Sequence, residues 1–166
     1  MNPSNDTFVL DANVFISANN TYYAPDLCAE FWKCLASYRE KSVFSIDRVH
    51  EELARRKDKL STWSNENKSM FASTRNDPME EKYADMVEWV RHGQYRVEAL
   101  EEFSGAADGW LAAYASVTGA TLVTHEHPAP GSLNHVKLPD VCEEFGITYV
   151  DTFDMLRRLG IRLCPE

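Results

Sequence analysis

The sequence predicts an α/β fold, a three-layer sandwich with a central, mostly parallel sheet. Short apolar runs typical of buried strands alternate along the chain with segments of helical periodicity, which is the pattern of βα units. The chain has 166 residues, of which 44% are hydrophobic, so it can enclose one core. We therefore expect a single domain over residues 1–166, with a helical elaboration at about 60–105.

The first strand is expected at residues 7–10, where β-forming apolar residues end at Asp11. A helix should begin at about Pro25, because Leu27, Phe31, Leu35 and Tyr38 share one helical face. The remaining elements follow the same signals, with Gly or Pro at several helix ends. They are a strand at 42–46 and a helix through Glu52, helical segments within 63–97 with a start at Pro78, a helix at 106–117, a strand at 121–124, a helix at 139–145, a strand at 147–150 and a helix at 153–159.

Composition excludes several classes of protein. Seventeen Lys and Arg against 26 Asp and Glu give a net charge of -9, so nucleic acid can bind only through a local basic patch or bound cations. The four cysteines lack metal-site spacing, and we expect reduced thiols. The amino-terminal segment lacks the features of a secretion signal and no apolar run is long enough to cross a bilayer, so a cytoplasmic location is expected.

Four acidic residues are placed where a site would form. Asp11 ends the first strand and Glu126 follows the strand at 121–124, so both lie beyond the carboxyl ends of parallel strands. Glu52, on the helix after the second strand, and Asp108, near the start of the helix at 106–117, can reach the same crevice. Neighbouring carboxylates repel one another unless a cation neutralises them, and hard oxygen ligands select Mg²⁺ or Mn²⁺. Such a site suits hydrolysis of a phosphodiester.

Each acid also has an ordinary structural interpretation. Asp11 is equally suited to a turn or helix cap, and Glu52 to a solvated helix face. Asp108 is favoured near the positive end of its helix. Glu126, between His125 and His127, also suits a His-Glu-His metal cluster or a surface loop. Residue types alone leave these alternatives open.

Taken in order, four segments resemble the PIN-domain family of ribonucleases. They are FVLDANVF at 8–15, VHEEL at 49–53, ADGWLAAYA at 107–115 and LVTHE at 122–126. Two further segments, KLPDVC at 137–142 and YVDTF at 149–153, are similar to a less-studied PIN-like branch of uncertain function. The fourth acid is Glu where Asp is commoner in the family. The resemblance spans most of the chain.

The resemblance implies an Mg²⁺- or Mn²⁺-dependent endoribonuclease, including the toxin of a toxin–antitoxin pair similar to the VapC toxins. Catalysis would depend on Asp11, Glu52, Asp108 and Glu126, and the metal ligands would be Asp11, Asp108 and Glu126. Thr124 and Asn13 would support the site, and Asp140 is an outside candidate for the same pocket. The implied partners are RNA and an antitoxin protein, with a homodimer left open.

Substrate contact requires positive charge, and the best local candidate is Arg55, Arg56 and Lys57, beside the helix of Glu52. A solvated helix end explains these cations equally well. Trp63, Trp89 and Trp110 could stack on bases, although we favour packing.

Two other classes compete with the ribonuclease. One is a non-catalytic RNA-binding or scaffold module of the same fold. The other is a phospho-aspartate phosphatase, which would need Asp rather than Asn13 two residues beyond Asp11.

Overall fold

The computed structural model describes residues 6–39 and 41–163. Strands and helices alternate through most of this range, as the sequence predicts. The elements, in chain order, are β1 Phe8–Leu10, α1 Ala12–Ser17, a π-helical turn Ala18–Tyr22, α2 Ala29–Tyr38, β2 Val43–Ile46, α3 Asp47–Ala54, α4 Lys59–Glu66, a 3-10 turn Lys68–Met70, β3 Phe71–Ala72, α5 Asp77–His92, α6 Val97–Gly105, α7 Asp108–Thr118, β4 Thr121–Val123, α8 Leu138–Phe145, β5 Tyr149–Val150 and α9 Thr152–Arg158.

The sheet has five strands in the order β3-β2-β1-β4-β5, and every pair is parallel. The central strand β1 pairs with β2 through Phe8 and Val43 and with β4 through Val9 and Leu122. All three residues of β1 are fully buried, as expected for a strand covered on both faces. The predicted parallel sheet is confirmed.

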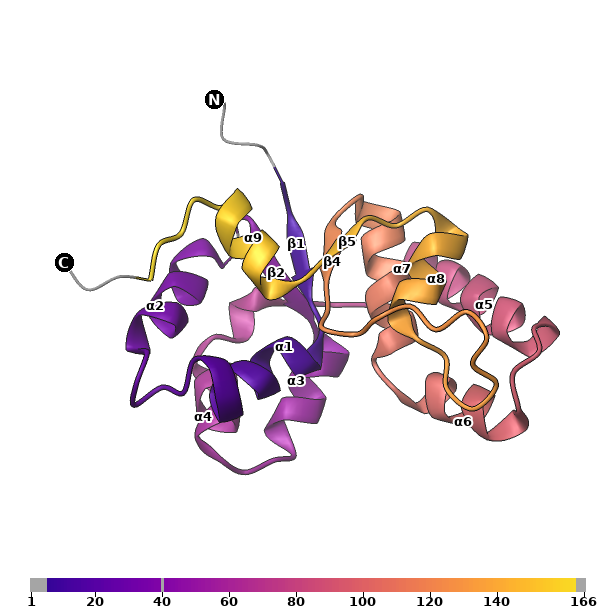
Figure 1. Cartoon of the computed structure of the whole chain (residues 1–166), viewed down its shortest axis with the longest axis horizontal. Coiled ribbons are helices and arrows are strands. Elements are labelled where there is room, and N and C mark those ends of the chain that lie inside the picture. The colour runs from indigo at the N-terminus through magenta and orange to yellow at the C-terminus, as the bar shows by residue number, and fades with distance from the viewer. Residues whose placement is uncertain (1–5, 40, 164–166) are drawn as a thin grey trace.

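Helices cover both faces of the sheet (Figure 1). On one side, α7 contacts β1, β2 and β4 and is itself covered by α5 and α8, with α6 beyond. On the other side lie α1, α2, α3 and α4, with α9 beside α2 through the hydrogen bond from Tyr38 Oη to the Leu159 carbonyl. The arrangement is the predicted three-layer α/β sandwich.

The start of the helix predicted at about Pro25 is wrong. Pro25 lies in a turn and α2 begins only at Ala29, so the side chain of Leu27 is 85% exposed. Phe31 and Leu35 are fully buried, as their spacing predicts. The turn is held locally, because the amide of Leu27 donates to the Ala24 carbonyl.

Helix α1, the π-helical turn that follows it and strand β3 were not predicted. Helix α1 begins directly after Asp11, whose side chain accepts a hydrogen bond from the Asn13 amide and caps the helix. Strand β3 lies within the segment expected to be helical and pairs with β2 at the edge of the sheet. With only two residues, β3 carries too little periodicity to be recognised from sequence.

Free thiols occur at Cys28, Cys34 and Cys142, as expected, whereas Cys164 lies outside the described residues. Within residues 6–39 and 41–163, every helix is too short or too polar to cross a membrane.

Candidate functional site

The carboxyl ends of the parallel strands form the edge where the predicted residues gather. Asp11 directly follows β1, and Glu126 lies three residues beyond β4. Asp108 is the first residue of α7, and Glu52 lies on α3. The fold thus brings all four acids close enough for their charges to act on the same groups.

Asp11 is the most buried of the four, with 3% of its surface exposed. Its Oδ1 accepts from the Asn13 amide at 3.4 Å and its Oδ2 from the Thr124 hydroxyl at 3.2 Å. Burial raises the pKa of Asp11 to about 6, and the charges of Glu126 and Glu52 add to the increase, while the two hydrogen bonds oppose it. The two hydrogen bonds therefore fix the Asp11 carboxyl group in a buried environment that disfavours its charged form.

Thr124 connects two of the acids. The buried hydroxyl donates to Asp11 and accepts a hydrogen bond from the Glu126 amide at 3.1 Å. This fits the supporting role expected for Thr124. Asn13 contributes through its backbone amide, while its side chain is exposed.

Asp108 has the most perturbed carboxyl group. Burial, followed by the charges of Asp11, Glu126 and Glu52, raises its pKa to about 8. Among the described residues, no amide or side chain donates a hydrogen bond to its carboxylate. The next residue is Gly109, where an added Cβ would lie 2.9 Å from Cε2 of Tyr83, so the helix starts against an aromatic ring.

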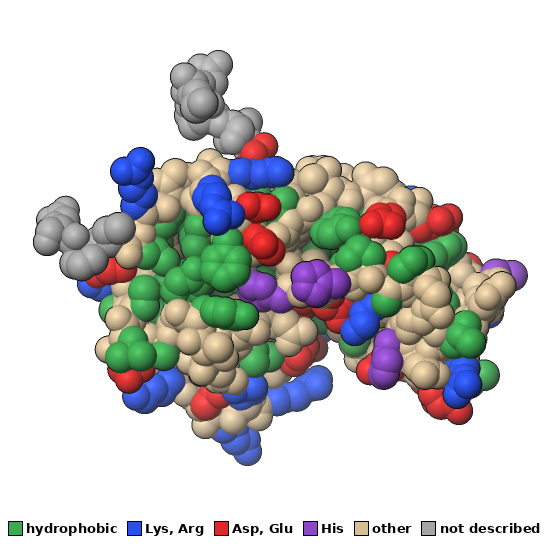
Figure 2. Space-filling model, viewed as in Figure 1, with side chains coloured by type: hydrophobic (Ala, Val, Ile, Leu, Met, Phe, Trp, Pro, Cys, Tyr) green, Lys and Arg blue, Asp and Glu red, His purple; other side chains and the backbone are tan. Residues whose placement is uncertain are grey.

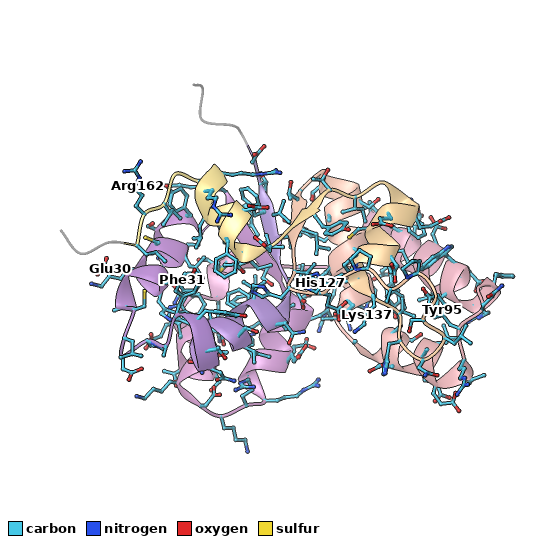
Figure 3. All side chains as sticks on the ribbon, in the orientation of Figure 1. Glu30, Phe31, Tyr95, His127, Lys137 and Arg162 are labelled. Atoms are coloured by element: carbon cyan, nitrogen blue, oxygen red, sulfur yellow. The ribbon has the colours of Figure 1, made fainter. Side chains whose placement is uncertain are left out.

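Glu126 is turned toward the start of α8. Its Oε2 accepts from the Leu138 amide at 2.8 Å, and its Oε1 lies 3.6 Å from Nζ of Lys137. Figure 3 labels Lys137 on the α8 side of the molecule, next to the loop that carries His127. The positive end of α8 and the ammonium group thus compensate part of the negative charge at this site.

Glu52 is the most peripheral of the four. It is exposed on α3. Partial burial raises the pKa of Glu52, and the neighbouring charges of Arg55 and Arg56 lower it. With Arg48, Arg55 and Ala106 it lines a hollow of about 320 Å³.

A smaller hollow of about 110 Å³ is lined by two of the four acids, Asp108 and Glu126, and by Lys137. Figure 2 shows acidic side chains recessed in the middle of the molecule, beside histidines and lysine or arginine side chains. Space for a small ion or a phosphate oxygen therefore exists between the two acids.

The donor chemistry fits a divalent cation, because carboxylates are hard ligands and no Lys, Arg or His side chain lowers the pKa of Asp11 or of Asp108. The ligand geometry is incomplete. Within the part of the chain that the structure describes, no three His, Cys, Asp or Glu side chains already surround one metal position. The contact from Glu126 to Leu138 explains this in part, since that carboxylate points toward α8.

Comparison with protein-family models gives a match over residues 8–163, nearly the whole described chain. The matching model is that of a domain of unknown function, DUF4411. The chain belongs to this family. No curated protein sequence matches it.

The cations predicted to contact substrate differ in setting within this DUF4411 domain. Arg55 lines the hollow beside Glu52. Arg56 is paired with Asp58 at 2.9 Å, and Lys57 is exposed with a left-handed backbone, φ 55°. Of the three, only Arg55 lines the hollow that Glu52 borders.

Arg48 was missed by the sequence analysis. Its guanidinium lies 4.4 Å from the ring centroid of Trp110, and the side chain lines the same hollow as Glu52. The i,i+4 spacing of Arg48 and Glu52 on one helix is the signal that could have identified it. Trp110 stacks on Tyr83 with ring centroids 3.9 Å apart, so it packs as expected.

Asp140, the outside candidate, is engaged in holding a loop. It is 7% exposed, and both carboxylate oxygens accept from the Ala129 amide at 3.1 Å. Burial raises the pKa of Asp140, and the charges of Glu143 and Glu126 add to this. Asp140 therefore fixes the loop between β4 and α8, next to Glu126.

Proposed function

We propose that this DUF4411 domain is a metal-dependent endoribonuclease, and that its acid cluster is the active site. The observation that carries the proposal is the pair Asp11 and Asp108, one buried and one half-buried carboxylate whose pKa values are raised to about 6 and about 8. Such a pair destabilises the fold unless a cation binds, so its presence is better explained by chemistry than by packing.

Asp11 and Asp108 would hold an Mg²⁺ or Mn²⁺ ion, with Glu126 as the third ligand. The bound ion would supply an activated water and neutralise charge on the phosphate. Thr124 keeps Asp11 oriented through its hydroxyl, and Lys137, at 3.6 Å from Glu126, provides a positive charge beside the reacting phosphate. Water adds to phosphorus, the bond to one ester oxygen breaks, and that oxygen takes up a proton.

RNA as the substrate follows from the resemblance to PIN ribonucleases and agrees with two arginines, Arg48 and Arg55, in the hollow next to Glu52. These side chains can contact the phosphate backbone although the whole chain has a charge of -9. The resemblance alone carries the further proposals of a toxin and an antitoxin partner, whereas the proposed cytoplasmic location rests on the features of the sequence. A protein inserting a basic side chain between Asp108 and Glu126 would block the site.

The test is cleavage of single-stranded RNA and DNA by the purified chain in Mg²⁺, Mn²⁺ and EDTA. Asp11→Asn and Asp108→Asn should abolish metal-dependent cleavage, because each removes a ligand charge. Asp26→Asn, a change of equal charge at an exposed position before α2, is the matched control. Cleavage by both site variants at the wild-type rate would exclude the assigned active site, and RNA binding without cleavage would favour the non-catalytic alternative.

A further inference from the structure

A third hollow adjoins the acid cluster and has no role in the chemistry proposed above. It has a volume of about 520 Å³ and lies beyond the ends of β4 and β5. Thr124 and Glu126, which belong to the acid site, form part of its wall. The rest of its wall includes Tyr22, His125, Asp151, Phe153 and Asp154.

Three aromatic rings from distant parts of the chain meet in this hollow. The ring of Tyr22 lies 5.8 Å from those of both His125 and Phe153, and the His125 and Phe153 centroids are 6.3 Å apart. His125 is oriented by Thr152, whose hydroxyl lies 2.9 Å from Nε2. These contacts fix the rings before any ligand arrives.

Tyr22 is exposed although it belongs to the aromatic group. It comes from the π-helical turn Ala18–Tyr22, and 54% of its surface faces solvent. Figure 2 shows hydrophobic side chains gathered beside the central histidines. An aromatic face left open next to fixed rings offers a stacking surface for a flat ligand.

The charge of the wall selects against a phosphate. Glu126, Asp151 and Asp154 line the hollow, and its wall contains no Lys or Arg among the described residues. Asp151 Oδ1 accepts from the Asp154 amide and Asp154 Oδ1 is paired with Arg157. Among the described residues, the Oδ2 atom of each of these acids has no hydrogen-bond partner and is left to accept from an N–H donor of a ligand. A neutral, flat ligand with N–H groups is complementary to this wall, whereas an anion is not.

We propose that this hollow binds an unpaired nucleobase of the RNA, adjacent to the phosphodiester held at the acid cluster. The proposal rests on the function proposed above and adds a base-binding subsite to it. Single-stranded RNA is recognised by bases splayed onto aromatic side chains and by hydrogen bonds to their edges. Because Glu126 lines both hollows, a base in this one lies next to the acids.

The acidic wall also predicts which bases fit. Adenine, cytosine and guanine carry an exocyclic amino group that can donate to a carboxylate, whereas uracil carries only a ring N–H. The hollow should therefore prefer bases with an amino group over uracil.

Nucleosides test the subsite without a phosphate or a metal. We expect adenosine, guanosine or cytidine, added in EDTA, to shift the ring resonances of His125 and Phe153 in NMR spectra more than uridine does. Tyr22→Ala should weaken nucleoside binding about tenfold, the size expected for loss of one stacking partner. Tyr22→Phe keeps the ring and should bind within about twofold of wild type, since stacking needs only the face.

Leu27→Ala is the matched control, because it truncates an exposed apolar side chain outside the hollow. Absence of nucleoside-induced shifts in the wild type, or equal binding by Tyr22→Ala and Leu27→Ala, would overturn the subsite. Saturable nucleoside-induced shifts that are lost in Tyr22→Ala would support the subsite even if the protein cleaves no RNA. Failure of the base-binding subsite can thus be distinguished from failure of the proposed ribonuclease activity. If cleavage is observed, Tyr22→Ala should raise KM for RNA more than it lowers kcat, whereas an unchanged KM would count against the subsite.

Discussion

Replacing Asp108 by Asn should make the metal-free protein more stable while removing its activity. Asp108 has a pKa of about 8 in the folded protein against 3.8 for a free side chain. Because the pKa is raised in the folded protein, the fold favours the protonated form of Asp108. The contribution of this carboxyl group to the free energy of unfolding is therefore fully present below pH 3.8 and is lost as the pH rises toward 8. Asn resembles the neutral carboxyl group and does not ionise, so the variant avoids this loss of stability.

The magnitude follows from the pKa interval. Between 3.8 and a working pH of 7 there are about 3 pH units, each equivalent to about 1.4 kcal/mol, which sets an upper limit of about 4 kcal/mol. Water entry and side-chain relaxation reduce this limit, and we expect a gain of about 2 kcal/mol in the free energy of unfolding. Asp11, with a pKa of about 6, should contribute to the same pH dependence in the wild type.

The assay is urea unfolding in EDTA at several values between pH 4 and 8, repeated with Mg²⁺. Wild type should lose stability as the pH rises through this range, and Asp108→Asn should lose less. If Mg²⁺ binds with a dissociation constant near 1 mM, 10 mM should stabilise the wild type by about 1.4 kcal/mol and the variant little. The reasoning is refuted if Asp108→Asn is no more stable than Asp26→Asn, or gains as much from Mg²⁺ as the wild type.

Three further changes test the supports of the site. Thr124→Val should lower the free energy of unfolding by about 1–2 kcal/mol and raise the pKa of Asp11 further, because it removes the hydroxyl that is bonded to Asp11 and to the Glu126 amide. Thr124→Ser keeps this hydroxyl and should resemble the wild type in urea unfolding and in an NMR titration of Asp11. Gly109→Ala should lower the free energy of unfolding by about 1–3 kcal/mol, since the added Cβ lies 2.9 Å from Tyr83 and 3.0 Å from Phe103. Gly105→Ala, whose added Cβ has nothing within 4 Å, should not destabilise the protein. Similar urea-unfolding midpoints for the two variants would contradict the packing argument. Asp140→Ala should increase the rate of hydrogen exchange at the Ala129 amide and lower the free energy of unfolding by about 1 kcal/mol. Asp140→Asn keeps one acceptor oxygen and should retain part of the protection of this amide from exchange.

The parts of the site that sequence could predict are those fixed by local structure. Asp11 follows a short apolar run of β-forming residues that indicates a buried strand, and Asp108 begins a helix closed by Gly119, whose φ of +76° suits glycine. In parallel βα units these two positions meet at one edge of the sheet whatever the details of packing. The sheet, the layers and the approach of the four acids were predictable for the same reason.

The parts that sequence could not predict depend on contacts between distant segments. Glu126 turns toward the Leu138 amide because the loop fixed by Asp140 brings the start of α8 beside it. Tyr22 meets Phe153 only because the π-helical turn after α1 packs against α9, and nothing in the local pattern of either segment indicates the other. The helix start at Pro25 was wrong for a similar reason, since helical spacing does not reveal that Leu27 finds no core to enter.

The three hollows at the acids lie in a row, because the small hollow of Asp108 shares a wall residue with each of the other two. Glu126 borders both the aromatic hollow and the small hollow of Asp108, while Ala106 borders the latter and the hollow of Arg48. A single extended chain can therefore contact an acid-rich aromatic surface, then Asp108 and Glu126, then two arginines. A nucleic-acid strand alternates neutral bases with charged phosphates and matches that order, whereas a small phosphate ester could fill only the middle hollow. The order of surfaces thus favours a polynucleotide over a small phosphorylated metabolite, and competition by nucleosides, but not by inorganic phosphate, at the aromatic hollow is the corresponding expectation.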